Sequence, residues 1–138
     1  MGTRAVIQVL DNEYGGAKCM CAQIYVHCDG YPTGLLWDIK ELLGEDPKIV
    51  NGLPLEIPDA FDGMGCFAAW LVGSLKKDQF GDVYLLGTGT ELEEEWTYKF
   101  YERDDSLYVK IVGERVGWNG KASTLTKAKL GQIEEQNG

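Results

Sequence analysis

The chain has 138 residues, 44% of them hydrophobic, and its 13 basic and 22 acidic side chains give a formal net charge of −9. This length and composition predict one globular domain over residues 1–138 and exclude an intrinsically disordered chain. The acidic excess repels a phosphate backbone, so we expect no direct nucleic-acid binding. No apolar run approaches the roughly 20 residues of a membrane span, and residues 1–6 lack the apolar stretch of a signal peptide. We therefore expect a cytoplasmic protein without membrane contact.

The first half of the chain predicts two strands followed by two helices. Residues 3–10 are apolar and rich in β-branched side chains, turn formers follow them, and residues 22–28 alternate as the hairpin partner. Apolar residues recur at helical spacing over 35–43, before Gly44, and again over 64–75. Residues 45–61 hold three of the four prolines, which predicts an ordered surface loop.

The second half predicts a meander of strands. Residues 82–86, 95–102 and 106–112 alternate as strands, with a turn at Arg103-Asp104-Asp105 and another over residues 87–90. Asn119-Gly120 is a hairpin signal, so residues 121–126 are predicted to pair back as a further strand. Residues 127–138 form a polar tail, which is either a short helix or frayed. The order β-β-α-α-β-β-β-β predicts an α+β domain in which two helices cover one face of an antiparallel sheet of five to six strands.

Alternation along these strands divides their side chains between two faces. The predicted inward set is apolar: Ile7, Val9, Ile24, Val26, Val83, Leu85, Trp96, Tyr98, Phe100, Leu107, Val109 and Ile111. The outward set mixes tyrosines with hydrogen-bonding and basic groups: Arg4, Gln8, Gln23, Tyr25, His27, Tyr84, Thr97, Lys99, Tyr101, Tyr108 and Lys110. Such a face supplies flat stacking surfaces and donors to a polar ligand. The alternative is that tyrosine simply has a high strand propensity and pairs across strands.

Two Asp-Gly turns stand directly before the two predicted helices, at residues 29–32 and 62–65. A helix start leaves backbone N–H groups unpaired, so two such starts together can border a ligand pocket, although each alone is compatible with an ordinary cap. Together with the outward face, these turns give the candidate ligand-binding residues, which are Arg4, Tyr25, His27, Asp29, Gly30, Tyr31, Asp62, Gly63, Met64, Gly65, Tyr84, Lys99 and Tyr101.

The cysteines do not predict a metal site. Cys19 and Cys21 are spaced too tightly for a structural zinc pair, and alternation sends His27 and Cys28 to opposite faces of their strand. We expect free thiols, no metal and no cofactor. Cys66 with His27 as base is an admissible nucleophile pair, but the chain carries no serine elbow, phosphate-binding loop or dinucleotide fingerprint. The sequence therefore favours a binding protein over an enzyme.

Three segments together carry a resemblance to a known family. These are Met1-Gly2-Thr3-Arg4, then Asp29-Gly30-Tyr31-Pro32, and then Phe61-Asp62-Gly63-Met64-Gly65-Cys66. In combination they resemble a family of small uncharacterised phage and bacterial proteins, and the resemblance extends over residues 1–102. It implies a phage or mobile-element context and no particular reaction.

Three hypotheses for the function follow. The leading one is a non-enzymatic, phage-encoded protein of the host cytoplasm that sequesters a small nucleotide-like or polar ligand and so acts against host defence. The second is an acidic protein-interaction module that inhibits a host defence protein. The third is a small hydrolase that depends on Cys66 or on acidic side chains. A homo-oligomer is compatible with each of them.

Overall fold

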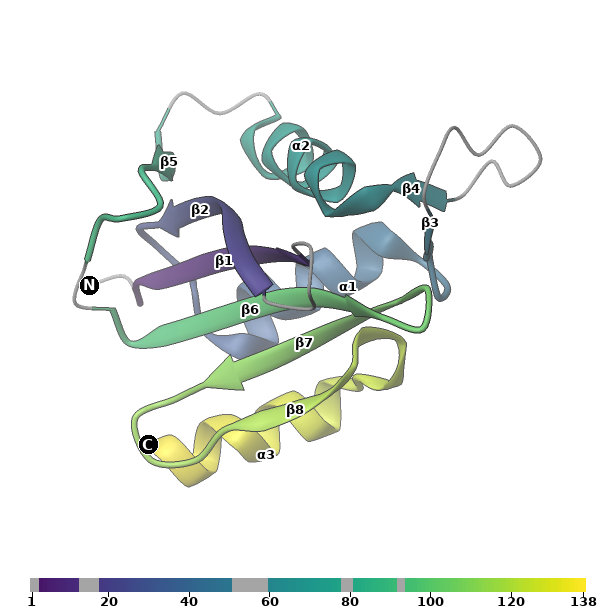
Figure 1. Ribbon diagram of the computed structural model, residues 1–138. Coiled ribbons are helices and arrows are strands. Elements are labelled where there is room, and N and C mark those ends of the chain that lie inside the picture. Colours follow the sequence, from purple (N-terminus) through teal and green to yellow (C-terminus); the bar gives the residue numbers. More distant parts are fainter. Residues whose placement is uncertain (1–2, 13–17, 51–59, 78–80, 92–93) are drawn as a thin grey trace.

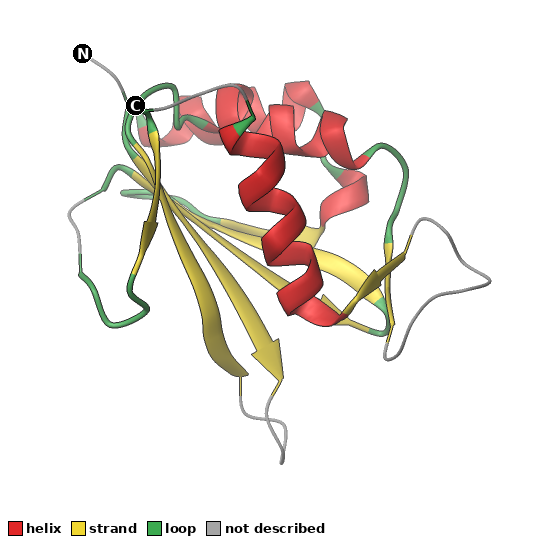
Figure 2. Cartoon of the chain, turned by 90° about the horizontal axis from the view of Figure 1, so that it is seen from above, coloured by secondary structure: helices red, strands yellow, loops and turns green. Residues whose placement is uncertain are grey.

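The computed structural model describes residues 3–12, 18–50, 60–77, 81–91 and 94–138 (Figure 1). These residues form a single curled sheet whose helices gather on one face (Figure 2), which confirms an α+β fold. The strands are β1 Ala5–Asn12, β2 Lys18–Val26, β3 Lys48–Val50, β4 Ala60–Asp62, β5 Val83–Leu86, β6 Trp96–Arg103, β7 Ser106–Val112 and β8 Trp118–Lys121. The α-helices are α1 Trp37–Leu43, α2 Gly63–Lys76 and α3 Lys127–Asn137, with a π-helical turn Pro32–Leu36 before α1 and a 3-10 turn Ala122–Thr124 before α3.

The sheet is larger than the predicted one and is mixed. Seven of its eight strands run in the order β4-β3-β7-β6-β1-β2-β5, and the eighth, β8, pairs with β7 outside this order. The expectation of an antiparallel sheet of five to six strands is wrong, because β1 lies parallel to β6 and β3 lies parallel to β4. The β1–β2 hairpin leaves one edge of β1 unpaired, and β6 reaches that edge after a long crossover through both central helices. Local sequence patterns contain no signal for such a distant pairing.

The predicted inward face forms most of the core. All of its members are buried except Leu85, which is 69% exposed because it lies on the edge strand β5. The π-helical turn, α1 and α2 cover this face with side chains such as Leu36, Ile39 and Phe67, each of them fully buried. The alternation of apolar and polar residues therefore predicted which side of each strand faces the core.

The C-terminal segment is a third helix, which decides between the two alternatives left open for the polar residues 127–138. The Thr126 side chain caps α3 by accepting a hydrogen bond from the Lys129 backbone N–H at 3.1 Å. Leu130 and Ile133, three residues apart on one helical face, are buried in the core. A threonine cap followed by this apolar pair is the local signal that identifies the helix.

The hairpin predicted at Asn119-Gly120 is also wrong. Both residues lie inside β8, which pairs with β7, and residues 121–126 form the end of β8 and the 3-10 turn. A Cβ at position 120 would lie 2.8 Å from the Trp118 ring, so this glycine is needed for ring packing. In contrast, the turn predicted at Arg103-Asp104-Asp105 is confirmed, with positive φ at both Asp104 and Asp105.

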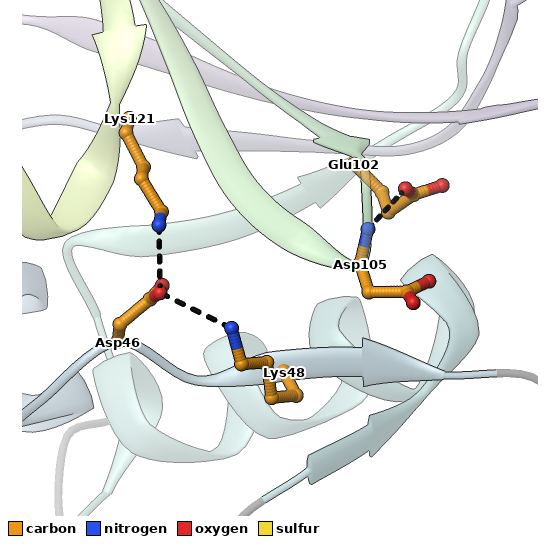
Figure 3. A network of polar contacts seen from close by, with 5 residues as sticks. All are labelled: Asp46, Lys48, Glu102, Asp105 and Lys121. Carbon is orange, nitrogen blue, oxygen red and sulfur yellow. Dashed lines mark hydrogen bonds and ion pairs between the residues drawn. The ribbon is translucent and has the colours of Figure 1, made fainter.

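The segment predicted as a Pro-rich surface loop over residues 45–61 contains secondary structure. It holds β3 and the first residues of β4, its Pro47 is buried, and residues 51–59 lie outside the described part of the chain. The Asp46 carboxylate pairs with the Lys121 ammonium at 3.0 Å and with that of Lys48 at 3.5 Å, and Figure 3 shows both contacts. These ion pairs connect the start of β3 to the end of β8.

Candidate functional site: the outer face of the sheet

Among the described residues, the two Asp-Gly segments line two different hollows. Tyr31 lines a hollow of about 470 Å³ together with Thr3, Glu95, Trp96, Glu114, Glu134, Asn137 and Gly138. Gly63 and Met64 line another, of about 150 Å³, with Asp11, Ile49, Val50, Glu102 and Asp105. Neither of these hollows includes a residue of the other segment. The first helix start and the second are therefore separate features of the surface.

Structural roles account for part of these segments. Gly30 is buried against β1, where a Cβ would lie 2.6 Å from that of Ala5, and its N–H donates to the Thr3 carbonyl at 2.8 Å. Gly63 has a φ of 79°, which favours glycine at the start of α2. Of the remaining candidates, Asp29, Asp62, Gly65 and Arg4 are exposed, and the Arg4 carbonyl accepts a hydrogen bond from the Glu95 N–H.

The nucleophile pair of Cys66 and His27 is not formed. His27 follows β2, where its N–H donates to the Asp82 carbonyl at 2.9 Å. Lys76, in the last turn of α2, donates to the carbonyls of Gly81 and Val83 on either side of Asp82. Cys66 lies in the first turn of the same helix, about 15 Å away along its axis at 1.5 Å per residue. The two side chains therefore lie near opposite ends of α2.

Two of the other thiols, those of Cys21 and Cys28, are poor nucleophiles. Burial, followed by the charge of Asp11, raises the pKa of Cys21. Desolvation, followed by the charge of the Asp82 carboxylate, raises the pKa of Cys28. Both thiols are therefore protonated near neutral pH, the opposite of an activated cysteine. Within the described residues, none of the four cysteines forms a disulfide, and no three His, Cys, Asp or Glu side chains are grouped to hold a metal ion.

On the sheet face opposite the helices, the strand register aligns a row of polar side chains. Gln8 of β1 lies opposite Gln23 of β2 on one side and Lys99 of β6 on the other. Lys99 in turn lies opposite Lys110 of β7, which lies opposite Asn119 of β8. Five neighbouring strands thus contribute one residue each to a continuous row, which we call the polar row.

Two pairs of stacked tyrosines flank the polar row. Tyr101 and Tyr108 lie opposite each other on β6 and β7, two residues from the lysines, with ring centroids 5.6 Å apart and an interplanar angle of 30°. The Tyr101 hydroxyl donates to the Asn119 side-chain oxygen. Tyr25 and Tyr84 form the second pair, on β2 and β5, also 5.6 Å apart and at 20°. The Tyr25 hydroxyl lies 2.8 Å from His27 Nδ1.

The two lysines of the polar row lie directly opposite each other on adjacent strands. Like charges directly opposite each other on adjacent strands repel and destabilise the pair. In the part of the chain that the structure describes, neither Lys99 nor Lys110 forms an ion pair, whereas Lys48 and Lys121 share Asp46. Lys110 is exposed and Lys99 is half-buried. The outer face therefore presents two neighbouring positive charges on a chain whose net charge is −9.

A chain of amide hydrogen bonds fixes the other end of the polar row. Gln23 is only 3% exposed, and its Nε2 donates to the carbonyls of Gly87 and Thr90 at 2.9 and 3.0 Å. Its Oε1 accepts a hydrogen bond from Gln8 Nε2 at 3.0 Å. The Thr90 N–H closes the turn on the Gly87 carbonyl at 3.0 Å, which confirms the turn predicted over residues 87–90. This turn is thereby held against the outer face.

The structure brings together only part of the predicted site. Tyr25, Tyr84, Lys99 and Tyr101 share the outer face, with His27 at its end, whereas Tyr31 and the 62–65 segment border other surfaces. Sequence reasoning placed Gln8, Gln23, Tyr108 and Lys110 on this face but left them out of the site. The signal for Tyr108 and Lys110 is symmetry, because both cross-strand pairs, 99 with 110 and 101 with 108, are centred on the Asp104-Asp105 turn.

No helix in the described ranges is both long and apolar enough to cross a membrane. Comparison of the chain with protein families, with curated proteins and with solved structures found no match.

Proposed function

We propose that this chain is a non-enzymatic binding protein that holds a small nucleotide-like anion on the outer face of its sheet. The observation that carries the proposal is a block of four residues on two adjacent strands. In it, the unpaired lysines Lys99 and Lys110 adjoin the stacked rings of Tyr101 and Tyr108. Ammonium groups bind phosphate as point charges, and tyrosine rings stack on flat heterocycles.

The spacing of this block suits a mononucleotide. A strand rises about 3.3 Å per residue, so the tyrosine pair lies about 7 Å along the strands from the lysine pair. This is comparable to the separation of the base and the 5′-phosphate in a mononucleotide. The two lysines stand on strands about 4.8 Å apart, so both ammonium groups can reach one phosphate. Binding of the anion would also relieve their mutual repulsion.

The biological role that we propose is sequestration. The three sequence segments that resemble small phage and bacterial proteins suggest a phage-encoded chain in the host cytoplasm. A binding protein without catalytic groups acts there by lowering the free concentration of its ligand. A nucleotide that signals infection is the class of ligand that such a protein would remove, which makes the chain an anti-defence protein.

Isothermal titration calorimetry against mono-, di- and cyclic nucleotides tests the proposal. The double variant Lys99→Gln/Lys110→Gln should weaken binding at least about tenfold, because a hydrogen bond to a charged group contributes about 1.5–3 kcal/mol. Lys129→Gln, which removes an exposed lysine of α3, is the matched control and should bind like the wild type. Null heats across the whole panel, or equal affinity in the double variant, would exclude this site.

A second candidate function is supported by the hollow beside Tyr31. Glu95, Glu114 and Glu134 converge there with Trp96, and none of the three carboxylates has an ion-pair partner among the described residues. Glu134 Oε1 is held at 2.6 Å from both the backbone nitrogen and the hydroxyl of Thr33. Carboxylates beside aromatic rings suit a lysine or arginine of a partner protein. This arrangement favours an acidic module that inhibits a basic host protein.

Affinity capture from a bacterial lysate separates the two candidates. The acidic module predicts a stoichiometric basic partner that is lost with Glu95→Gln/Glu114→Gln and retained with the control Glu135→Gln on the exposed side of α3. The same partner should be retained by the double lysine variant. If the lysine variant lost the partner instead, the partner would bind the outer face and not the hollow beside Tyr31. A Cys66-dependent hydrolase is not proposed, since the geometry separates Cys66 from His27.

A further inference from the structure

We propose that Gln8 reads the base of the ligand, by presenting an amide whose orientation is fixed by two backbone carbonyls. This inference rests on the nucleotide site proposed above and adds to it a residue that determines specificity. It assigns the ligand to the class whose ring carries a hydrogen-bond donor and an acceptor side by side, as the nucleobases do. An aryl phosphate, which has the ring and the phosphate without such an edge, lies outside this class.

The orientation of Gln8 follows from counting donors and acceptors. A glutamine amide has two N–H donors on Nε2 and an acceptor at Oε1. Gln23 directs both donors to carbonyls, those of Gly87 and Thr90, so its amide nitrogen must face the turn. Its Oε1 then faces Gln8 and can only accept, which requires Gln8 to present Nε2 to it. The turn thus sets the orientation of Gln23, and Gln23 sets that of Gln8.

Gln8 retains unused hydrogen-bonding groups on the outer face. One of its two Nε2 hydrogens is committed to Gln23, and its Oε1 accepts no hydrogen bond from any residue within the described ranges. The side chain is half-buried, so these groups remain accessible. An amide with one free donor and one free acceptor pairs bidentately with a base edge that has the complementary pattern, as glutamine does with adenine.

The register places Gln8 beside the proposed site. It lies directly opposite Lys99 and diagonally from Tyr101, a relation in which Cα atoms are about 7–8 Å apart and long side chains still meet. A ring stacked on the β1 side of Tyr101, with its phosphate at the lysine pair, has an edge next to Gln8. The polar row then binds both ends of the ligand, the phosphate through its lysines and the base through its glutamine.

The test compares the tightest-binding nucleoside monophosphate of the panel with phenyl phosphate, by calorimetry. The wild type should bind the nucleotide at least about fivefold more tightly, because two neutral hydrogen bonds contribute about 1–3 kcal/mol. Gln8→Met, which keeps the side-chain length, should abolish this preference and leave the affinity for phenyl phosphate unchanged. Gln8→Asn, which withdraws the amide by one methylene, should do the same. Lys99→Gln/Lys110→Gln should weaken both ligands equally.

The outcomes separate the two proposals. If the lysine variant loses both ligands while Gln8→Met lowers both equally or neither, the base-reading role of Gln8 is overturned and the anion site stands. If wild-type protein binds neither ligand, the site itself fails and the role of Gln8 fails with it. A melting temperature close to that of the wild type shows that each variant is folded. A merely structural role of Gln8 would shift that temperature without changing the preference for the nucleotide.

Discussion

Tyr98 is a core residue that also forms a buried hydrogen bond. Its ring is fully buried on β6, and its hydroxyl donates to the Gly30 carbonyl at 2.5 Å. Burial, followed by the nearby charge of Glu134, raises the pKa of Tyr98 well above its ordinary value. The phenol therefore connects the centre of the sheet to the segment that precedes the first helix.

Tyr98→Phe should lower the free energy of unfolding by about 1–3 kcal/mol, because it leaves the Gly30 carbonyl without its donor in the core. The change removes one oxygen and keeps the ring, so packing is preserved. Urea denaturation at pH 7 measures the difference. Tyr108→Phe on the outer face is the control and should change stability by less than about 0.5 kcal/mol. Equal stability of the Tyr98 variant and the wild type would contradict this role.

Tyr98 also predicts how stability responds to alkali. Its pKa is raised in the folded state, so the unfolded chain releases this proton first as the pH rises. The stabilisation is fully present below about pH 10, the ordinary tyrosine pKa, and is lost as the pH rises from there toward the folded-state pKa. Between pH 9 and 11, the wild type should therefore lose more stability than Tyr98→Phe. Parallel curves for the two proteins would contradict the raised pKa.

Among the elements, β8 and α2 use glycine in opposite ways. Gly120 of β8 lies under the Trp118 ring, which would meet an added Cβ at 2.8 Å. Gly73 of α2 is exposed, and an added Cβ there would meet nothing within 4 Å. Gly120→Ala should therefore destabilise the protein by about 1–3 kcal/mol through overpacking. Gly73→Ala should stabilise it by about 0.5–1 kcal/mol, because alanine loses less backbone entropy in a helix.

Urea titration of both variants against the wild type checks this pair, with the same methyl group added at each site. Opposite signs of the two changes support the assigned roles. If Gly120→Ala were neutral, the Trp118 ring would have to move freely, and the interpretation of Asn119-Gly120 as part of a packed strand would be wrong.

Prediction from sequence succeeded where the signal is local. Alternation assigned Ile24, Tyr98 and Val109 to the core, and helical spacing located α2. It failed where the paired segments are far apart in the sequence, or where one short motif is compatible with two different structures. Nothing near β1 specifies its parallel partner β6, and β3 and β4 are only three residues long, so their alternation is too brief to detect. Asn119-Gly120 fits a turn as well as a strand, and only the Trp118 contact decides.

For the candidate site, too, the local features could be predicted from the sequence and the long-range ones could not. Alternation placed the tyrosines and lysines on one face, but their grouping into pairs depends on cross-strand register. Local sequence patterns could not decide whether the two helix starts share one hollow, because this depends on how α1 and α2 are placed relative to each other. Tyr31 and Gly63 in fact line different hollows.

At the scale of the whole molecule, the C-terminal helix joins distant parts of the chain. Asn137 accepts hydrogen bonds from the Arg115 and Val116 N–H groups at 2.6 and 2.9 Å, and it donates to the Val116 and Ile133 carbonyls. Glu134, on the same helix, holds Thr33 from the other half of the sequence. α3 therefore stabilises both the β7–β8 connection and the start of the first helix.

Asn137→Ala should lower the free energy of unfolding by about 2 kcal/mol, because it removes four hydrogen bonds whose partners are in part accessible to water. Gln136→Ala, an exposed neighbour on the same helix, should change it by less than about 0.5 kcal/mol. Thermal unfolding followed by circular dichroism measures both. Similar melting temperatures for the two variants would show that α3 is held by Leu130 and Ile133 alone.

The parallel contact of β1 with β6 sets an order of events during synthesis on the ribosome. Ala5 pairs with Trp96, so one edge of β1 stays unpaired until most of the polypeptide has been translated. Until then, the nascent β1–β2 hairpin exposes an open edge and an apolar face, which are the features that chaperones bind and that promote aggregation. Because such long-range closure is slow, a message truncated before codon 96 would yield an insoluble fragment instead of a smaller working protein.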